Sequence, residues 1–271
     1  MTNNVSIVIP TFNRADYLKQ CIESALSQTY PCEIIVCDHG SSDQTPTVAL
    51  SYGSAITYVR REIDSGVHFC WLDGILHASS DFIHLNYDDD WIEPLFVEKC
   101  MKLFTDDVGF VYSNARAFYE KENKYSEAQF TYFDKTGVYP SSHLVKFAMR
   151  SLISPGAIIL RKQIILDNLF CGKLPFSKYE YRGVGPDLLF SLMSTIKYKK
   201  IGFVNECLAV FRSHVNSITV DASSDALKTL KIDRAYKEAR KYYLTVDFIR
   251  KYRLNDYLYL YYRIKNKLRL I

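Results

Sequence analysis

The sequence lacks the signatures of several common protein classes. Its seven cysteines are an odd number without a CxxC pair, so neither a disulfide framework nor a structural zinc site is expected, and a reducing cytoplasm fits best. The absence of GxGxxG disfavours a dinucleotide oxidoreductase, and the absence of GxxxxGK followed by Ser or Thr disfavours a P-loop enzyme. No window approaches the roughly 18 apolar residues that cross a bilayer, and no basic segment precedes the apolar run at 5–10. We therefore expect neither a membrane span nor secretion.

The composition is that of an ordinary globular chain, but the charge is unevenly distributed. With 271 residues, 48% hydrophobic and 24% charged, the chain can form one large domain or two interlocked halves. The formal net charge is +4. Residues 226–271, named here the basic tail, hold 13 Lys and Arg against 4 Asp and Glu, together with eight tyrosines. The basic tail thus carries +9, and residues 1–225 carry −5.

Four alternations of an apolar run and a helical pattern open the chain. The runs at 5–10, 33–37, 56–59 and 82–85 predict strands, followed by helical spacing at 15–28, from about 45, at 67–78 and at 93–104. This order predicts an α/β fold with a mainly parallel sheet flanked by helices. Ligands bind beyond the carboxyl ends of such strands, so the loops at 11–14, 38–43 and 88–90 form the candidate site.

The alternation stops near residue 121, where a second half begins. Residues 121–142 predict a long irregular excursion. The pattern after it predicts an apolar segment at 153–160, a loop rich in Tyr and Gly at 179–185, a helix from 187 to about 195 and a strand at 201–211. We expect halves at 1–120 and 121–225, followed by a helical basic tail.

Three consecutive carboxylates, Asp88 to Asp90, follow the apolar run at 82–85. Their mutual repulsion raises their pKa values unless a cation intervenes. Mg²⁺ or Mn²⁺ held by one or two such carboxylates completes its shell with water and phosphate oxygens. The triplet by itself fits equally an acidic turn that caps the next helix.

Four ordered motifs carry a family resemblance. They are VSIVIPTFNR at 5–14, SALSQTYP at 24–31, EIIVCDHGSSD at 33–43 and the triplet at 88–90. In order and spacing they resemble glycosyltransferase family 2. The resemblance implies a nucleotide-binding fold of the GT-A type, a nucleotide-sugar donor, a divalent metal ion (Mn²⁺ or Mg²⁺) and inversion at the anomeric carbon. It makes 1–120 the nucleotide-sugar-binding half and 121–225 the acceptor-binding half of one domain.

Transferred residue by residue, the resemblance assigns the donor's base to the ends of the first two strands. Pro10, Thr11 and Phe12 would hold the base, and the family's acidic pair falls on Asp38 and His39, where histidine replaces the second acid. If Asp38 accepts from a pyrimidine N–H, uracil or thymine is the expected base. An Asx turn in the loop that follows Asp38 is the alternative.

The resemblance also assigns residues to the metal and the diphosphate. The family's DxD element falls on the triplet, with Asp88 on the ribose, Asp89 on the metal and Asp90 as second choice for the metal. A late family element falls on VFRSHVNSI at 210–218. There His214 is a third metal ligand or a structural histidine, and Arg212 neutralises phosphate.

An inverting transfer needs a carboxylate base on the face opposite the leaving nucleoside diphosphate. The resemblance places that base at the start of a helix in the second half, where Asp187 is the best match. An acidic residue that only favours the first helical turn is the alternative.

The basic tail suggests where the acceptor is bound. A cationic aromatic helix can lie in an anionic membrane surface, and an acceptor linked to a lipid diphosphate would explain such docking. A helical pair packed on the core and nucleic-acid binding are alternatives, but no nucleic-acid motif accompanies the charge, so no nucleic-acid partner is expected.

The leading hypothesis is an inverting transferase that moves a sugar from UDP-hexose or UDP-N-acetylhexosamine to a hydroxyl of a lipid-linked glycan. It would act in O-antigen or capsular polysaccharide biosynthesis, peripherally at the inner face of the plasma membrane. A metal-dependent nucleotidyltransferase and a catalytically silent sugar-nucleotide or membrane-binding module are the alternatives. The oligomeric state stays open.

Overall fold

The computed structural model of the chain describes residues 5–149, 153–175, 177–180, 183–214 and 226–268. Parts of three predicted segments lie outside the described residues: 181–182 of the loop rich in Tyr and Gly, 215–218 of the late family element, and 269–271 of the basic tail.

The first four predicted strands form a parallel unit. The elements are β1 (Val5–Thr11), α1 (Ala15–Leu26), β2 (Cys32–Asp38), α2 (Thr45–Leu50), β3 (Thr57–Arg60), α3 (Val67–His77) and β4 (Phe82–Leu85). The strands lie side by side in the order β3-β2-β1-β4, all parallel. Every residue of β1 is buried, which explains its continuous apolar run, because helices cover both faces of the sheet.

The elements that follow β4 extend the same sheet. They are β5 (Trp91–Ile92), α4 (Phe96–Met101), β6 (Val108–Tyr119), β7 (Lys124–Tyr125), β8 (Gly137–Pro140), α5 (Ser141–Ala148), β9 (Ile158–Arg161), α6 (Lys162–Asn168), α7 (Pro186–Lys197) and β10 (Lys200–Ser213). Short 3-10 turns occur at Gly53–Ala55 and Pro155–Ala157. The full order is β3-β2-β1-β4-β9-β6-β10-β5, with β7 beside β6 and β8 beside β10. Strands from both predicted halves therefore share one core.

Most paired residues lie in parallel ladders, and β10 runs parallel to β6 along nearly its whole length. The antiparallel pairs involve the strands β5, β7, β8 and β9. The prediction of an α/β fold with a mainly parallel sheet flanked by helices is confirmed.

Two local predictions are corrected, and one strand was not predicted. The helix expected at 93–104 is limited to α4, because Trp91–Ile92 pairs with β10 and the chain turns before the helix begins. The excursion at 121–142 is not wholly irregular, since it contains β7 and β8. The long strand β6 lies between β9 and β10, although its polar residues hid it in the sequence.

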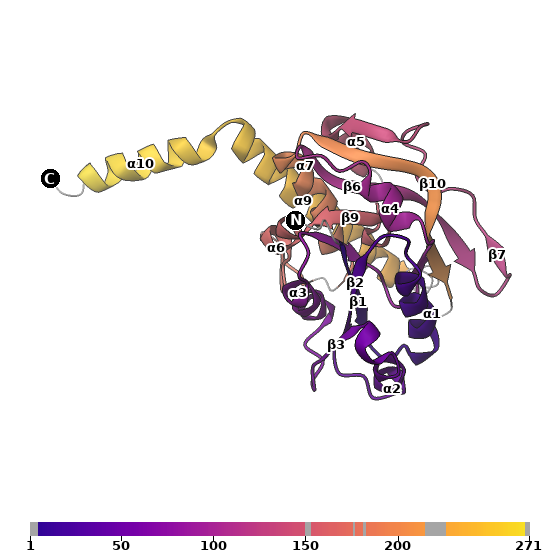
Figure 1. Cartoon of the computed structure of the whole chain (residues 1–271). Helices are drawn as coiled ribbons and strands as arrows, with labels where there is room; N and C mark the ends of the chain where they lie inside the picture. Colours follow the sequence, from indigo (N-terminus) through magenta and orange to yellow (C-terminus); the bar gives the residue numbers. More distant parts are fainter. Residues whose placement is uncertain (1–4, 150–152, 176, 181–182, 215–225, 269–271) are drawn as a thin grey trace.

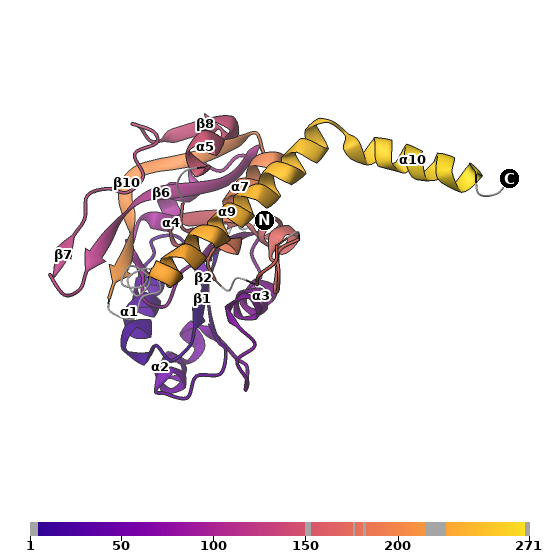
Figure 2. The same ribbon diagram turned by 180° about the vertical axis from the view of Figure 1, so that it is seen from behind.

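Two helices form the described part of the basic tail, α9 (Ala226–Lys251) and α10 (Leu254–Leu268). Helix α9 lies across the back of the body and packs on α7, with Ala235 and Ala239 buried (Figure 2). Arg253 has a φ of 51°, a left-handed conformation that separates the two helices. Helix α10 then projects away from the body (Figure 1). Within the described residues, no helix combines the length and apolar character needed to cross a bilayer.

Candidate functional site

Strand register brings the predicted loops to one edge of the sheet. Thr11 lies opposite Asp38 at the ends of β1 and β2, so both strands finish together. Strand β4 ends at Leu85, beside Val8 of β1, and the chain then continues along β1 to Asp88. The candidate loops therefore meet at the carboxyl edge, where ligands bind in sheets of this type.

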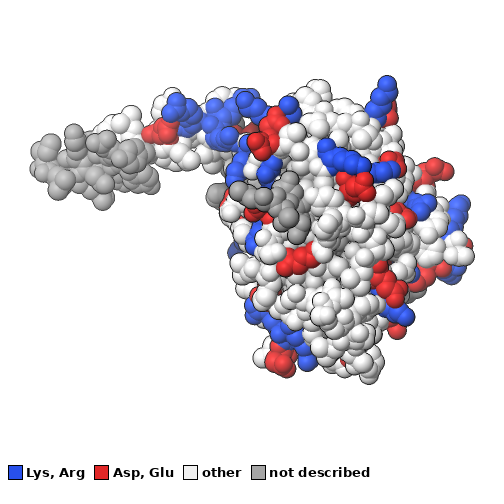
Figure 3. Space-filling model, in the orientation of Figure 1, with Lys and Arg blue, Asp and Glu red and all other residues white. Residues whose placement is uncertain are grey.

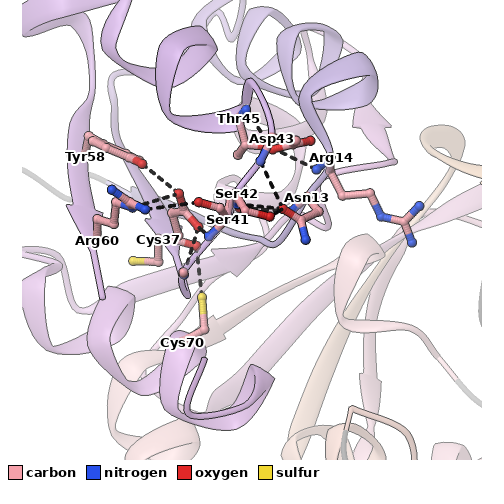
Figure 4. A network of polar contacts seen from close by, with 12 residues as sticks. Asn13, Arg14, Cys37, Ser41, Ser42, Asp43, Thr45, Tyr58, Arg60 and Cys70 are labelled. Atoms are coloured by element: carbon pink, nitrogen blue, oxygen red, sulfur yellow. Dashed lines mark hydrogen bonds and ion pairs between the residues drawn. The ribbon is translucent and has the colours of Figure 1, made fainter. Parts of the chain in front are cut away.

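Asp38 is held inside its own loop by neighbours that include Ser41, Tyr58 and Arg60, which Figure 4 labels. Its Oδ1 accepts hydrogen bonds from the backbone N–H groups of Gly40 (3.1 Å) and Ser41 (2.8 Å). Its Oδ2 accepts from the Tyr58 hydroxyl (2.7 Å) and lies 3.6 Å from Nε of Arg60. The Asp38 side chain has no exposed surface. The geometry thus matches the Asx-turn alternative, and both carboxylate oxygens already have partners.

The neighbouring base-site residues differ in accessibility. Pro10 and Thr11 are buried, whereas Phe12 is 37% exposed. The Phe12 ring stacks on His39, with centroids 4.7 Å apart and an angle of 24° between the planes. His39 Nδ1 lies 2.7 Å from Oδ1 of Asp64, a residue in the loop between β3 and α3. Phe12 and His39 therefore lie together just beyond the carboxyl ends of β1 and β2.

The acidic triplet is crowded and partly buried. Burial, and then the charge of Asp89, raise the pKa of Asp88 to about 7. The same two causes raise the pKa of Asp90 well above its usual range. Carboxylates in such surroundings gain from a nearby cation.

Pairing between β5 and β10 brings the late family element to the triplet. Val210 lies opposite Trp91, which places Arg212 and His214 beside Asp89 and Asp90. His214 Nε2 lies 3.0 Å from Oδ2 of Asp89. The Asp90 carboxylate has a different partner, since its Oδ1 accepts a hydrogen bond from the Arg212 backbone N–H at 2.8 Å.

Arg212 holds this arrangement together. Its side chain donates to the Asp89 carbonyl oxygen (3.0 Å), to Glu120 (3.0 Å) and to Gln20. Its guanidinium also lies over the rings of Tyr17 and Trp91, 5.0 Å from each centroid. Only 9% of the side chain is exposed. In this geometry Arg212 positions the triplet, and the predicted contact with phosphate would require these bonds to rearrange.

Asp187 lies in the first turn of α7. Its Oδ1 accepts from the backbone N–H groups of Gly185 (2.8 Å) and Leu188 (2.9 Å). Burial raises its pKa to about 7, against the lowering effect of those donors. The charges of Asp187, Asp90 and Asp89 all act on Tyr87, so both acidic groups lie near this residue. A carboxyl group with a pKa near 7 can serve as a proton acceptor at neutral pH.

Sequence reasoning missed two residues of this site. Asp64, which binds His39, follows the short strand β3 without any motif around it. The pKa of Tyr236, from α9, is raised first by burial and then by the charge of Asp187, which places this tyrosine near Asp187, and the backbone of Ala235 closes over Gly185. Both contacts join segments far apart in the sequence, so no local signal marks them.

The donor set around Asp89 fits a divalent metal ion. Two cis ligands of an octahedral ion bound at about 2.1 Å lie about 3 Å apart, and the Asp89–His214 separation is 3.0 Å. Carboxylate is a preferred ligand of Mn²⁺ and Mg²⁺, and Mn²⁺ also accepts an imidazole, which suits it less well. Among the described residues, no group of three or more His, Cys, Asp or Glu is arranged to hold a metal, so waters and phosphate oxygens would complete the shell.

Comparison with known proteins identifies the family. The model described as glycosyl transferase family 2 matches residues 6–166, more than half of the chain. The chain belongs to glycosyl transferase family 2. An uncharacterized glycosyltransferase of Rickettsia typhi is 41% identical over 95 residues, which cover 35% of this chain and 30% of that protein. EpsH of Bacillus subtilis, named as a candidate glycosyltransferase, is 27% identical over 226 residues, or 80% of this chain and 63% of EpsH. The chain thus spans less than two thirds of these relatives.

Comparison with solved structures confirms that this chain has the GT-A-type fold. S. aureus TarS in complex with UDP-GlcNAc superposes with a TM-score of 0.65 at 16% identity, covering 89% of this chain and 70% of that one. The mannosyltransferase PcManGT from Pyrobaculum calidifontis, in complex with GDP-Man and Mn²⁺, gives a TM-score of 0.53 at 15% identity and covers 90% and 70%. At these identities the likeness extends to the fold alone.

Proposed function

We propose that the chain is an inverting glycosyltransferase that moves a sugar from a UDP-sugar, a UDP-hexose or UDP-N-acetylhexosamine, to a hydroxyl of a glycan acceptor. One observation carries the proposal: two acidic groups of different character lie near Tyr87, the Asp89–His214 pair and the buried Asp187. Family membership and the UDP-GlcNAc bound by TarS support the donor class.

Each group has a part in the transfer. Asp187, as the carboxylate, takes the proton from the acceptor hydroxyl while the hydroxyl oxygen attacks the anomeric carbon. Asp88, Asp89 and Asp90 line the side from which the nucleoside diphosphate leaves, with Arg212 fixing their backbone. Asp89 and His214 would hold a Mn²⁺ or Mg²⁺ ion, which neutralises charge on the diphosphate when bound.

Thermal unfolding with nucleotides tests the donor class. UDP or a UDP-sugar is expected to raise the unfolding midpoint in the presence of Mn²⁺, and a chelator should remove most of the shift. At about 100 times Kd the stabilisation is about 2.7 kcal/mol, which corresponds to several degrees for a chain of this size. GDP- and dTDP-sugars serve as comparison ligands.

The outcome also separates the competing functions. Binding of a UDP-sugar with release of UDP on addition of an acceptor supports the transferase. Binding without any turnover of any sugar donor would favour a silent module, and release of pyrophosphate from a free nucleoside triphosphate would favour a nucleotidyltransferase.

We propose further that the acceptor is linked to a lipid diphosphate in O-antigen or capsular polysaccharide assembly, and that the basic tail docks on the cytoplasmic face of the membrane. Four large side chains of α10 are at least half exposed and share one face of the helix by their spacing, Tyr257, Leu260, Tyr261 and Ile264. Lys and Arg side chains gather where α9 and α10 leave the body (Figure 3). An exposed apolar face beside positive charge suits an anionic bilayer surface.

Removal of residues 254–271 tests this docking. The affinity of the shortened chain for vesicles that contain anionic lipid is expected to fall at least about tenfold, because the chain loses both apolar anchors and positive charge. Leu260→Glu, which places a charge on the apolar face of α10, should weaken binding in the full chain. Neutral vesicles provide the control. Unchanged sedimentation with anionic vesicles would reject membrane docking, and self-association through α10 in the absence of lipid would point to a second copy instead.

A further inference from the structure

We propose that His39, held in one tautomer by Asp64, is the hydrogen-bond acceptor that recognises a ring N–H of the donor's base. The inference rests on the proposed function, because it requires a nucleotide-sugar donor. It assigns base recognition to an imidazole–carboxylate pair at the edge of β1 and β2.

The usual candidate at this edge is already engaged. Both oxygens of Asp38 accept hydrogen bonds within the protein, and the side chain is fully buried. Because the side chain has no exposed surface, a base N–H could reach this carboxylate only if the groups that cover it moved and its hydrogen bonds to the protein rearranged.

The contact with Asp64 decides which nitrogen of His39 carries the proton. A carboxylate only accepts hydrogen bonds, so the 2.7 Å contact between Nδ1 and Oδ1 of Asp64 requires a proton on Nδ1. In a neutral imidazole the other nitrogen, Nε2, then carries a lone pair and acts as an acceptor. Asp64 is itself fixed, because its Oδ1 also accepts from the Gly66 backbone N–H at 2.6 Å.

His39 Nε2 is available to a ligand. In the part of the chain that the structure describes, no protein group forms a hydrogen bond with Nε2, and 11% of the side chain is exposed. The backbone N–H of His39 donates to the Thr11 carbonyl oxygen (3.2 Å), which keeps the ring at the mouth of the two strands. A flat base bonded to the edge of the imidazole lies near the imidazole plane, where it can also contact the exposed ring of Phe12.

The chemistry of a lone-pair acceptor defines the class of base. Uracil, thymine and guanine carry a ring N–H that can donate to Nε2. Cytosine and adenine present a ring nitrogen with a lone pair at the corresponding edge, and two lone pairs repel each other. His39 thus offers a hydrogen-bond acceptor at the position of the family's second acid. The predicted uracil or thymine base fits this acceptor, with His39 in place of Asp38 as the residue that accepts from the base N–H.

Calorimetric titration of UDP and CDP into four variants of the full chain tests this assignment. His39→Phe keeps the ring stack but removes the acceptor, and Asp64→Ala releases the tautomer, since free histidine favours the proton on Nε2. Both are expected to weaken UDP binding about tenfold. His39→Asp restores an acceptor, and Asp64→Asn keeps an oxygen for Nδ1–H, so both should stay within about threefold of wild type. His39→Phe should also lose the preference for UDP over CDP.

Long-range ¹H–¹⁵N NMR spectra of the histidine ring give a second measurement. Wild type is expected to show a proton on Nδ1 and a bare Nε2, and Asp64→Ala should shift the proton toward Nε2. Glu62→Ala, which removes a neighbouring exposed acid, is the control and should change neither the spectrum nor the affinity.

Three results would overturn the inference. Wild-type UDP affinity in His39→Phe, or a proton on Nε2 in wild type, removes His39 as the acceptor while leaving the transferase proposal intact. Absence of binding of any nucleotide to wild type removes both. GDP and dTDP titrations then identify which base with a ring N–H is bound.

Discussion

Asp187→Asn is expected to lower kcat about 10³-fold while leaving UDP-sugar affinity nearly unchanged. The amide cannot take a proton from the acceptor hydroxyl, and general base catalysis contributes about this factor. The replacement keeps an oxygen at the Oδ1 position, so the hydrogen bonds from Gly185 and Leu188 can persist and the first turn of α7 should remain folded. Initial rates of UDP release and donor titrations measure the two quantities separately.

Two other acids of the 121–225 half serve as controls for Asp187. Asp167 lies on α6, 3.7 Å from Lys197 and substantially exposed, and Glu180 precedes the same helix α7. Asp167→Asn and Glu180→Gln should each retain wild-type kcat. Loss of activity in either variant with full activity in Asp187→Asn would transfer the base role to that acid.

The pH dependence of the same reaction follows from the pKa of Asp187. Burial raises that pKa to about 7, so kcat/KM should rise with pH, reach half its maximum near pH 7 and level off above it. Because the pKa of this acid is higher in the folded than in the unfolded state, ionisation of Asp187 lowers stability as pH rises from about 4 to 7. Asp187→Asn should therefore unfold at a higher temperature than wild type at pH 8, and at a similar temperature at pH 4.

Asp89→Asn is expected to lower metal-dependent donor affinity about 100-fold, because a neutral amide is a much weaker ligand for a divalent cation and removes the anion that pairs with His214. Titration of Mn²⁺ at fixed UDP-sugar, followed by thermal unfolding and by turnover, measures the effect. The variant should need far more Mn²⁺ for half-maximal activity.

The structure offers a sharp comparison within the triplet. Asp90 faces the Arg212 backbone, and Asp90→Asn keeps an acceptor for that N–H, so its dependence on Mn²⁺ should change much less than that of Asp89→Asn. Asp106→Asn changes an exposed acid in the turn before β6 and serves as the control, whose dependence on Mn²⁺ should equal that of wild type. An Asp90→Asn variant that loses Mn²⁺ dependence while Asp89→Asn retains it would reverse the metal assignment.

Local sequence patterns predicted the parallel half of the fold well. The apolar runs that became β1, β2, β3 and β4 are short, β-branched and separated by helical spacing, so each element is encoded by its own residues. The same stretch carries the motifs of family 2, which the family model matches from residue 6 to 166. Order and spacing along the chain were sufficient there, because each loop of the site follows directly from its strand.

Strand β6 shows why the part of the sheet beyond β4 was harder to predict. Asn114 and Arg116 lie in the strand yet look like loop residues in the sequence. Asn114 Oδ1 accepts from the backbone N–H of Phe130 (2.9 Å), and Arg116 stacks over Tyr125, 4.1 Å from the ring centroid. Both side chains thus contact residues that follow the strand in the sequence, so the periodicity of the strand itself could not reveal it.

The sequence by itself determined the family, the α/β class and the candidate residues at the ends of β1, β2 and β4, since these depend on local patterns. Only the tertiary structure decided how those residues are used. Contacts between distant segments bury Asp38 in its turn, join Asp64 to His39, pair His214 with Asp89 and close α9 over the start of α7. Hydrogen bonding and burial set the charge and availability of each group, and both arise only when the chain is folded.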